Sequence, residues 1–250
     1  MDLGIEGRVA LVMGASKGLG RGIAGALAAE GAHVAIASRS RERLDATVAE
    51  LDGQVTAFVA DAGDLDRLAT LPAEVEGALG PIDILVTNTG GPPQGRALDN
   101  PIEEWEEAFR SLVLGVRVLV EGVLPKMREQ GWGRIVNVGS NSTVEPVPDL
   151  TLSNANRLAA IGFLKTLARE VAADGITVNT VVTGKFATDR LAENLGSMEA
   201  AERSGRETVP AGRLGTPEEF GDLVAFLASD RAAYVNGASI PIDGALLRSV

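Results

Sequence analysis

The chain contains no cysteine and only one histidine, His33. Without cysteine it forms no disulfide and offers no thiolate for catalysis or metal binding. A serine–histidine–aspartate triad or a histidine-based metal site would have to use His33, and its neighbours support neither, so we expect it to be structural. A chain without disulfides is typical of a reducing compartment, and we expect a cytoplasmic protein with no metal site.

Basic residues and long apolar runs are also scarce. Lys and Arg number 23 against 34 Asp and Glu, which gives a formal net charge of −11. So acidic a chain disfavours nucleic acid and anionic membranes as partners. No apolar run approaches a membrane span, and no basic segment precedes an apolar core at the start of the chain. We therefore expect the partner to be a small-molecule substrate.

The pattern along the 250 residues is that of one large α/β domain, because no linker, repeat or low-complexity tract divides it. Short apolar strands alternate with amphipathic helices, which is typical of a parallel sheet covered on both faces. Strands are expected at residues 9–13, 33–37, 55–59, 82–86 and 134–138, and helices over residues 65–79, 105–130 and 216–228. Pro72 should kink or divide the first of these helices. The helix over residues 105–130 is apolar around more than half its circumference, which sheet burial and a second subunit together would explain.

The stretch from Arg8 to Gly20 predicts a phosphate site. Its apolar run stops at Gly14, glycines follow at Gly18 and Gly20, and a helical pattern begins there. A strand that turns sharply into a helix leaves backbone N–H groups and a positive dipole end free to bind phosphate. Glycines permit the tight turn, the close approach of a pyrophosphate and the packing of helix on strand. The pattern favours a dinucleotide site, and a plain strand-to-helix turn is the alternative.

The end of the second strand indicates which dinucleotide is bound. An acidic residue there accepts from the ribose 2′-hydroxyl of NAD, whereas basic residues suit the 2′-phosphate of NADP. This chain offers Ser38 and Arg39 with no carboxylate before Glu42, and Lys17 could supply a second cation. We therefore expect NADP in preference to NAD, the alternative being that the arginines are solvated. Asp61, after the third strand, either accepts from the adenine amino group or caps the next helix.

Four motifs follow the expected strands in the order of a known family. They are Gly14-Ala15-Ser16-Lys17-Gly18-Leu19-Gly20, Asn88-Thr89-Gly90, Ile135-Val136-Asn137-Val138-Gly139-Ser140 and the tail from Val235-Asn236-Gly237 to Asp243-Gly244. Together they resemble the short-chain dehydrogenase/reductase family, and its β-ketoacyl-ACP-reductase-like members most. The resemblance covers nearly the whole chain. It implies a Rossmann-type, doubly wound sheet of seven parallel strands with helices on both faces, a nicotinamide cofactor and a homo-oligomer, tetramer or dimer.

The catalytic tetrad of that family, Asn, Ser, Tyr and Lys, is matched only in part. Ser140 matches the serine, whereas Ser153 and Arg157 stand at the tyrosine and lysine positions and Leu112 at the asparagine position. An aliphatic hydroxyl is a weaker acid than a phenol by about three pKa units, roughly 4 kcal/mol. Arg157 stays protonated and cannot take part in a proton relay. The chain's only tyrosine, Tyr234, precedes the last strand and is expected to pack there.

Carried over residue by residue, the resemblance implies a set of site residues. The expected cofactor contacts are Gly14, Ser16, Lys17, Gly18, Leu19, Gly20, Ser38, Arg39, Asp61, Ala62, Asn88, Thr89, Gly90, Arg157, Gly184 and Thr188, and the expected catalytic residues are Ser140, Ser153 and Arg157. Ser140 would bind the substrate oxygen, and a water held by Ser153 could relay the proton. Lys185 and Asp149 are replacement proton donors that no spacing supports.

Two hypotheses on function remain open. The first is an oxidoreductase that moves hydride between NADP(H) and a carbonyl or hydroxyl compound, such as a 3-oxoacyl one, with a non-standard proton donor. The second is an NADP(H)-binding protein without redox turnover, whether sensor, scaffold or partner subunit. The segment over residues 186–215 resembles the family's substrate lid, and a surface excursion is the alternative.

Overall fold

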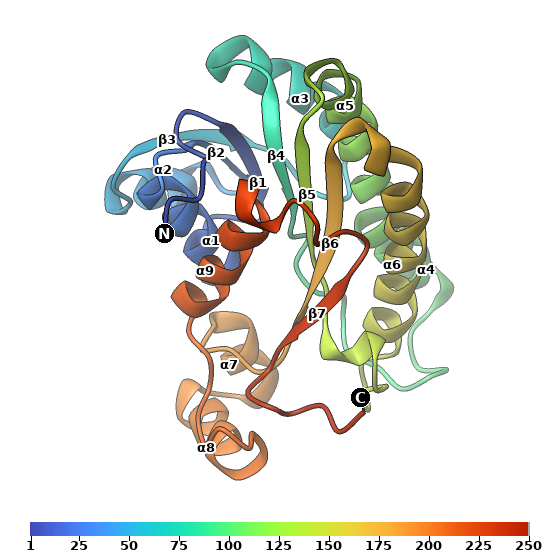
Figure 1. The fold of residues 1–250 in the computed structure, drawn as a ribbon. Coiled ribbons are helices and arrows are strands. Elements are labelled where there is room, and N and C mark those ends of the chain that lie inside the picture. Colours follow the sequence, from blue (N-terminus) through green and yellow to red (C-terminus); the bar gives the residue numbers. More distant parts are fainter. Residues whose placement is uncertain (250) are drawn as a thin grey trace.

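Seven parallel strands form one sheet in the computed structural model, which describes residues 1–249. Their order across the sheet is β3-β2-β1-β4-β5-β6-β7. The strands are β1 (Val9–Met13), β2 (His33–Ser38), β3 (Gln54–Val59), β4 (Ile82–Thr87), β5 (Gly133–Val138), β6 (Ile176–Thr183) and β7 (Ser239–Ile242). The doubly wound, seven-stranded sheet expected from the sequence is confirmed (Figure 1).

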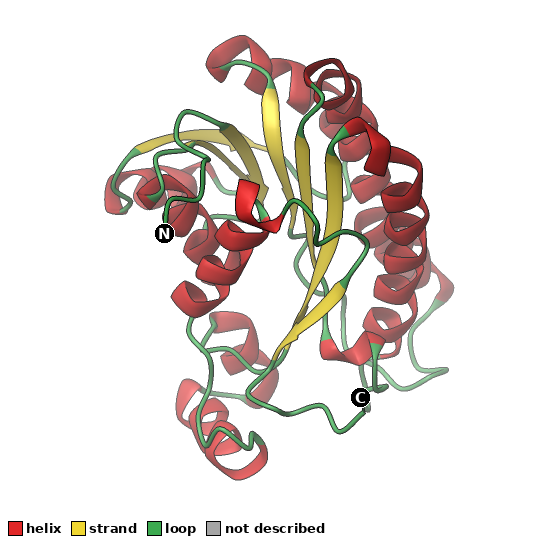
Figure 2. Cartoon of the chain, viewed as in Figure 1, coloured by secondary structure: helices red, strands yellow, loops and turns green. Residues whose placement is uncertain are grey.

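Helices cover both faces of this sheet (Figure 2). One face carries α1 (Gly18–Ala29), α2 (Arg41–Glu50) and α9 (Pro217–Leu227), and the other carries α3 (Leu65–Leu79), α5 (Gly115–Gln130) and α6 (Thr151–Val171). The remaining helices are α4 (Ile102–Phe109), α7 (Asp189–Leu195) and α8 (Met198–Thr208). Short helical turns lie at η1 (Arg110–Leu114), η2 (Asn141–Thr143), η3 (Ala172–Asp174) and η4 (Asp230–Ala232).

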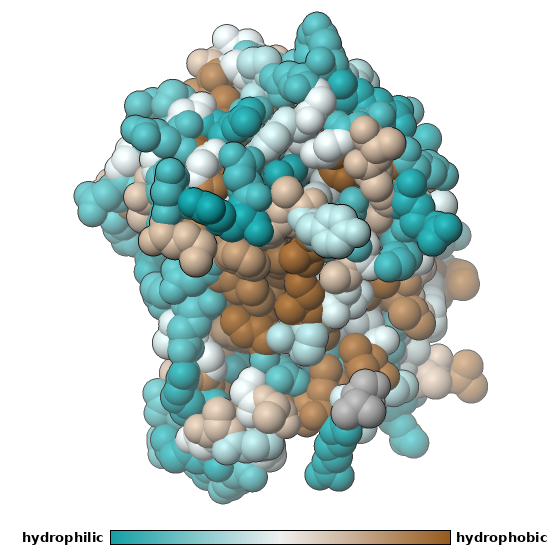
Figure 3. Space-filling view, in the orientation of Figure 1, coloured by the Kyte–Doolittle hydropathy of each residue, from teal (hydrophilic) through white to brown (hydrophobic). Residues whose placement is uncertain are grey.

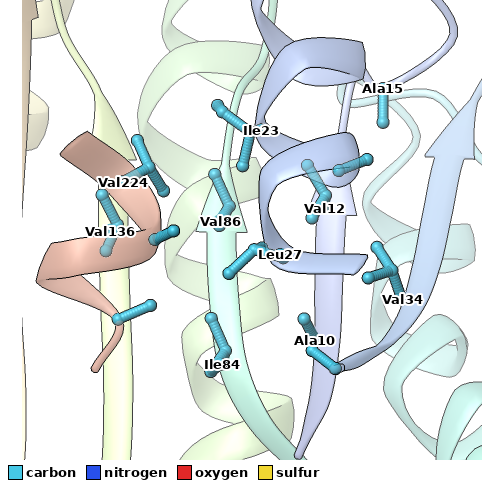
Figure 4. Packing of buried hydrophobic residues seen from close by; sticks show 14 of the residues in the cluster. Ala10, Val12, Ala15, Ile23, Leu27, Val34, Ile84, Val86, Val136 and Val224 are labelled. Atoms are coloured by element: carbon cyan, nitrogen blue, oxygen red, sulfur yellow. The ribbon is translucent and has the colours of Figure 1, made fainter. Parts of the chain in front are cut away.

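Burial on both faces explains why the central strands are almost continuously apolar. All residues of β1, β4 and β5 are buried. Figure 4 shows Ile23 and Leu27 of α1 packed over Val12 of β1 and Val86 of β4, with Val224 of α9 beside them. This core fixes α1 against the sheet, and with it the turn that precedes the helix.

The strand order reverses between β1 and β4, and this reversal positions the site. The chain runs outward from β1 to β2 and β3, then returns to pair β4 with the other edge of β1. Connections on the two sides of that point leave in opposite directions. In open α/β sheets this opens a crevice beyond the carboxyl ends of the strands, where ligands bind.

The long helix expected over residues 105–130 differs from the expectation in its start and in its middle. It begins earlier, at Ile102, and a π-helical turn, Arg110–Leu114, separates α4 from α5. Pro72, expected to kink or divide its helix, lies inside a continuous α3. The Pro72 ring is buried against Gly122 of α5, where an added Cβ would lie only 2.6 Å from it. This packing stabilises α3 although the helix contains a proline.

The expectation that Tyr234 packs against the last strand is wrong. Its side chain is fully exposed on the turn between η4 and β7. Ala232 is buried and Val235 packs against the core, so these two residues provide the inward contacts of the turn. Within residues 1–249, none of the helices combines the length and the apolar composition needed to cross a membrane.

The helices α1 and α9 approach each other closely because glycines lie at their contact. A Cβ on Gly22 of α1 would be 2.2 Å from the carbonyl oxygen of Pro217, and one on Gly221 of α9 would be 2.4 Å from the carbonyl oxygen of Gly22. A capping box between Thr216 and Glu219 fixes the start of α9 at this contact. Hydrogen bonds from Arg213 and the Thr216 backbone hold the pKa of Glu219 at about 2.

Replacing Gly22 by alanine therefore tests whether this contact supports the fold. The added methyl group must push α9 away from α1, and we expect Gly22→Ala to lower the free energy of unfolding by about 1–3 kcal/mol. The control is Gly77→Ala in α3, where an added Cβ meets nothing within 4 Å. Alanine there should raise the free energy of unfolding by about 0.5–1 kcal/mol. Urea denaturation measures both. Equal effects of the two substitutions would contradict the close contact.

Candidate functional site

A cleft of about 1010 Å³ lies beyond the carboxyl ends of the strands and brings together nearly all residues singled out from the sequence. Every expected catalytic and cofactor residue lines it except Gly20. Gly20 is buried behind the turn, where a Cβ would lie 2.2 Å from the Gly14 carbonyl oxygen. Its role is thus the close packing of α1 on β1.

The glycine turn after β1 is held by side chains from two other segments. Gly14 has a φ of +61°, and a Cβ on it would lie 2.5 Å from the carbonyl oxygen of Asn88, so only glycine fits. The Asn88 amide donates to the Gly14 carbonyl at 3.3 Å. The Thr47 hydroxyl of α2 shares its proton between the Arg43 carbonyl at 2.9 Å and the Ser16 carbonyl at 3.2 Å. The turn is therefore preorganised.

The first turn of α1 has no capping side chain. Its N-cap residue is Lys17, which makes no side-chain cap hydrogen bond, and the turn contains no acidic residue. By contrast, side chains cap α2, α3, α7, α8 and α9. Free N–H groups and the helix dipole at Gly18 and Leu19 therefore face the cleft without an internal acceptor. This is a site for an anionic group.

The ends of β2 and β3 meet at one side of the cleft. The Ser38 hydroxyl oxygen is buried and has no hydrogen-bond partner among residues 1–249, and Ser38 lines the cleft. Arg39 is 82% exposed, with its Nε 3.9 Å from the Asp61 carboxylate. Asp61 also accepts from the Gly63 amide at 2.9 Å. The cap of α3 is Asp64, so the alternative that Asp61 caps this helix is wrong.

The ammonium group of Lys17 is paired with α7. It lies 3.3 Å from the carboxylate of Asp189 and 3.4 Å from that of Glu193. The second cation expected for a 2′-phosphate thus joins the glycine turn to α7 in this structure. A bound phosphate would compete with these two carboxylates for it.

Ser140 and Ser153 lie at the other end of the cleft. The Ser140 hydroxyl accepts from the Ser142 amide at 3.2 Å and donates to Asn141 Oδ1 at 3.3 Å. Ser153 is buried, and its hydroxyl is 3.5 Å from that of Ser142. Leu112 is buried in the π-helical turn against Leu152. Leu112 therefore presents an apolar side chain to this end of the cleft.

Arg157 holds two segments together at this end. Its guanidinium donates to the Val138 carbonyl of β5 at 2.8 Å and to the Gly90 carbonyl after β4. Burial, and to a smaller extent the charge of Arg190, lower the pKa of Arg157 to about 10. The group still carries its charge at neutral pH.

The segment expected as a lid contains two helices, α7 and α8, which project beyond the layers of the fold (Figure 1). Thr188 caps α7 by accepting from the Leu191 amide at 3.3 Å. Lys185 donates to Ser204 and Thr208 of α8, both at 2.8 Å, so it anchors α8. Asp149 lines the cleft with a left-handed backbone, at a φ of +59°.

Several lining residues were missed by the sequence analysis. They include Pro92, Pro93, Gln94, Glu104, Glu107, Ser111 and Val147. No local motif marks them, because loops and helical segments bring them to the cleft only in the fold.

The sequence analysis also did not predict a buried series of polar contacts between strands. Thr87 donates to Asn137 at 2.9 Å, and Asn137 donates to Thr180 at 3.4 Å. Its signal was a polar residue inside each of three apolar strands.

The donor set at the adenosine side suits a phosphorylated dinucleotide. Free amides, a glycine cradle and an unsatisfied buried hydroxyl line one continuous cleft. Within residues 1–249, no group of three His, Asp or Glu side chains is placed to hold a metal ion.

Comparisons with known proteins agree with this geometry. The family model described as enoyl-(acyl carrier protein) reductase matches residues 14–246. The 3-oxoacyl-(acyl-carrier-protein) reductase FabG of Haemophilus influenzae is 36% identical over 245 residues, which cover 98% of this chain and 100% of that protein. Dehydrogenase/reductase SDR family member 4 of Sus scrofa is 33% identical, covering 96% of this chain and 87% of that protein.

A solved structure is also similar over its whole length. The L-sorbose reductase of Gluconobacter frateurii, solved with NADPH and L-sorbose, superposes with a TM-score of 0.94 at 29% identity and covers 100% of both chains. The match to the family model extends from the glycine turn to the tail of the chain. The chain belongs to the short-chain dehydrogenase/reductase family of oxidoreductases.

Proposed function

We propose that this protein is an NADP(H)-dependent oxidoreductase acting on a carbonyl or hydroxyl compound. The observation that carries the proposal is the uncapped first turn of α1, whose amides face the same cleft as Ser140. An anion-binding helix start and a hydroxyl at the opposite end are what a nicotinamide dinucleotide and its substrate together require. The cofactor of the similar L-sorbose reductase structure, NADPH, supports this assignment.

The preference for NADP follows from the ends of β2 and β3. The unsatisfied hydroxyl of Ser38 and the exposed guanidinium of Arg39 are suited to a 2′-phosphate. Asp61 accepts from Gly63 and faces Arg39, so its carboxylate is engaged away from a ribose 2′-hydroxyl. We assign Ala62, Asn88, Thr89, Gly90 and Gly184, which line the cleft, to the remaining cofactor contacts.

When bound, NADPH supplies a hydride to a carbonyl carbon, and the oxygen takes up a proton to give an alcohol and NADP⁺. Ser140 is suited to hold that oxygen, because the Ser142 amide fixes its oxygen as an acceptor and leaves its proton free to turn from Asn141 to the substrate. Ser153 lacks the bulk and acidity of a phenol. We assign it to holding a water that delivers the proton.

The relatives suggest which class of substrate to test first. The similar FabG protein of Haemophilus influenzae is a 3-oxoacyl-(acyl-carrier-protein) reductase, which makes a 3-oxoacyl compound a reasonable first substrate to test. We assign residues 186–215 to a lid over this substrate, because α7 contacts the glycine turn through Lys17 and the loop after β4 through Arg190.

Binding of NADP(H) without turnover is the second candidate. It is favoured by Arg157, whose guanidinium is engaged with two backbone carbonyls, and by Leu112, which offers no polar atom. Such a protein would keep the phosphate site and lose the proton donor. The first candidate is still preferred, because general acid–base catalysis is worth about 10²–10⁴-fold and its loss slows hydride transfer without abolishing it.

We also propose a homo-oligomer, because large apolar side chains remain exposed on α4 and α6. Ile102 and Phe109 of α4 are 66% and 44% exposed, and Leu158 of α6 is 54% exposed. Figure 3 shows further apolar side chains gathered at the surface between α9 and β7. Contact with other copies of the chain would cover both areas.

Arg39→Gln tests the cofactor preference. We expect the dissociation constant for NADPH to rise about tenfold, because a charge-assisted contact with the 2′-phosphate is lost, while that for NADH stays unchanged. Arg41→Gln is the control, since Arg41 is also exposed but pairs with Asp45 and does not line the cleft. Fluorescence titration measures both cofactors. An unchanged NADPH affinity in Arg39→Gln would rule out this role.

Turnover separates the two candidate functions. We expect the wild-type protein to oxidise NADPH with at least one compound in a panel of ketones and 3-oxoacyl thioesters, and to bind NADPH in titration. Binding with no oxidation across the panel would favour the protein without turnover.

On a turned-over substrate, we expect Ser140→Ala to lower kcat/KM about 10²-fold through loss of the hydrogen bond to the oxygen. Ser111→Ala is the control, because Ser111 lines the same cleft while its hydroxyl bonds to the Glu107 carbonyl at 3.0 Å. It should leave kcat/KM within about twofold of the wild-type value. Full activity of Ser140→Ala would remove Ser140 from the mechanism.

A further inference from the structure

Two guanidinium groups from different helices meet on one short loop in the cleft. Arg157 of α6 donates to the Gly90 carbonyl and, at 2.8 Å, to the Val138 carbonyl. Arg190 of α7 donates to the Pro92 carbonyl at 2.7 Å, and its Nη2 lies 3.2 Å from where a Cβ on Gly91 would be. Both cations are thus held at three consecutive residues, Gly90 to Pro92.

Neither guanidinium is neutralised by an acidic side chain. No carboxylate among residues 1–249 lies within 4.0 Å of either group, whereas Lys17 and Arg39 in the same cleft have carboxylates within that distance. The two guanidinium groups are close enough to repel each other, since the charge of Arg190 adds to burial in lowering the pKa of Arg157. Two adjacent cations without a counterion are unfavourable, and a bound anion would relieve that repulsion.

Both groups keep donors free for such an anion. A guanidinium has five N–H donors in a planar fork. The contacts of Arg157 use Nη1 and Nη2 and that of Arg190 uses Nη2 alone, so N–H groups remain on both. Carbonyl partners fix the position of each group without cancelling its charge. The pair is therefore oriented before a ligand arrives, which suits the bidentate recognition of a carboxylate.

The cleft as a whole does not repel anions, although the chain does. Its net charge is −11, yet six basic and six acidic side chains line the cleft. They are Lys17, Arg39, Arg43, Arg157, Lys185 and Arg190 against Asp61, Glu104, Glu107, Asp149, Asp189 and Glu193. Asp189 and Glu193 pair with Lys17, and Asp61 pairs with Arg39. The other lining carboxylates, Glu104, Glu107 and Asp149, make no ion pair within 4.0 Å of Arg190.

We propose that Arg157 and Arg190 bind a carboxylate of the substrate, so that the substrate class is an oxo acid or the corresponding hydroxy acid. This inference rests on the proposed function for the carbonyl or hydroxyl group at Ser140. Arg190 is then a specificity-determining residue carried by α7, which already contacts the loop after β4 in this structure.

A phosphate of the cofactor offers the same chemistry as a substrate carboxylate. We favour the substrate because the free amides of α1 and the group at Ser38 and Arg39 already serve the phosphates of a dinucleotide. Arg157 lies at the reactive end, four residues after Ser153 on α6. The test below separates the two sources.

The experiment compares acids with their methyl esters, which differ only in the charged group. The full-length protein is saturated with NADPH, and 2-, 3- and 4-oxo acids and their methyl esters are titrated while its melting temperature is recorded. The same pairs are assayed for NADPH oxidation. The variant is Arg190→Gln, and the matched control is Arg203→Gln, an exposed arginine of α8 that does not line the cleft.

We expect the wild-type protein and Arg203→Gln to bind at least one oxo acid about tenfold or more tightly than its ester. In Arg190→Gln that ratio should fall to within about threefold of unity, with the affinities for the ester and for NADPH unchanged. No preference for any acid, or a preference that survives Arg190→Gln, would overturn the proposal. A weakened affinity for NADPH in Arg190→Gln would assign the guanidinium to a cofactor phosphate and overturn it as well.

The two assays distinguish failure of the carboxylate site from failure of the proposed enzyme function. If the acids bind selectively and no pair supports NADPH oxidation, the carboxylate site stands and the enzyme assignment fails. If ketones are reduced with no preference for acids, the enzyme assignment stands and the carboxylate site fails.

Discussion

The free amides at the start of α1 are the feature on which the site depends. A buried strand ends at Met13, a glycine turn follows at Gly14, and α1 begins at Gly18 without a capping side chain. The turn is held by Asn88 and Thr47, and the helix by close packing of Gly22 against α9. Much of the fold around β1 therefore serves to present unsatisfied N–H donors to one cleft, where they stabilise an anion.

At the opposite end of the cleft, two side chains of α6 determine which chemistry is available. Ser153 and Arg157 lie four residues apart on α6, and both line the cleft. A serine hydroxyl cannot match the acidity of a phenol, and a guanidinium bound to two carbonyls holds its proton. Arg157 supplies a fixed positive charge at this end of the cleft. A site of this kind favours recognition of an anionic group over rapid proton transfer.

The sequence predicted the fold and the cofactor end of the cleft because both depend on local patterns. Apolar runs in alternation with helices determine the parallel sheet, and the glycine turn follows directly from β1. Contacts made only in the tertiary structure were out of reach. Nothing in the sequence shows that Lys17 pairs with α7, that Arg190 reaches the loop after β4, or that Tyr234 faces solvent. Likewise Asp64 and Asp61 were equivalent as helix caps until the backbone was placed.

Hydrogen exchange of the backbone amides from Gly14 to Gly20, measured with and without saturating NADPH, tests the central claim most directly. If the amides at the start of α1 hold the cofactor's phosphates, their exchange slows on binding. It slows more than exchange at the start of α4, which also has no capping side chain. Unchanged exchange from Gly14 to Gly20 in a protein shown by titration to be saturated would contradict the account.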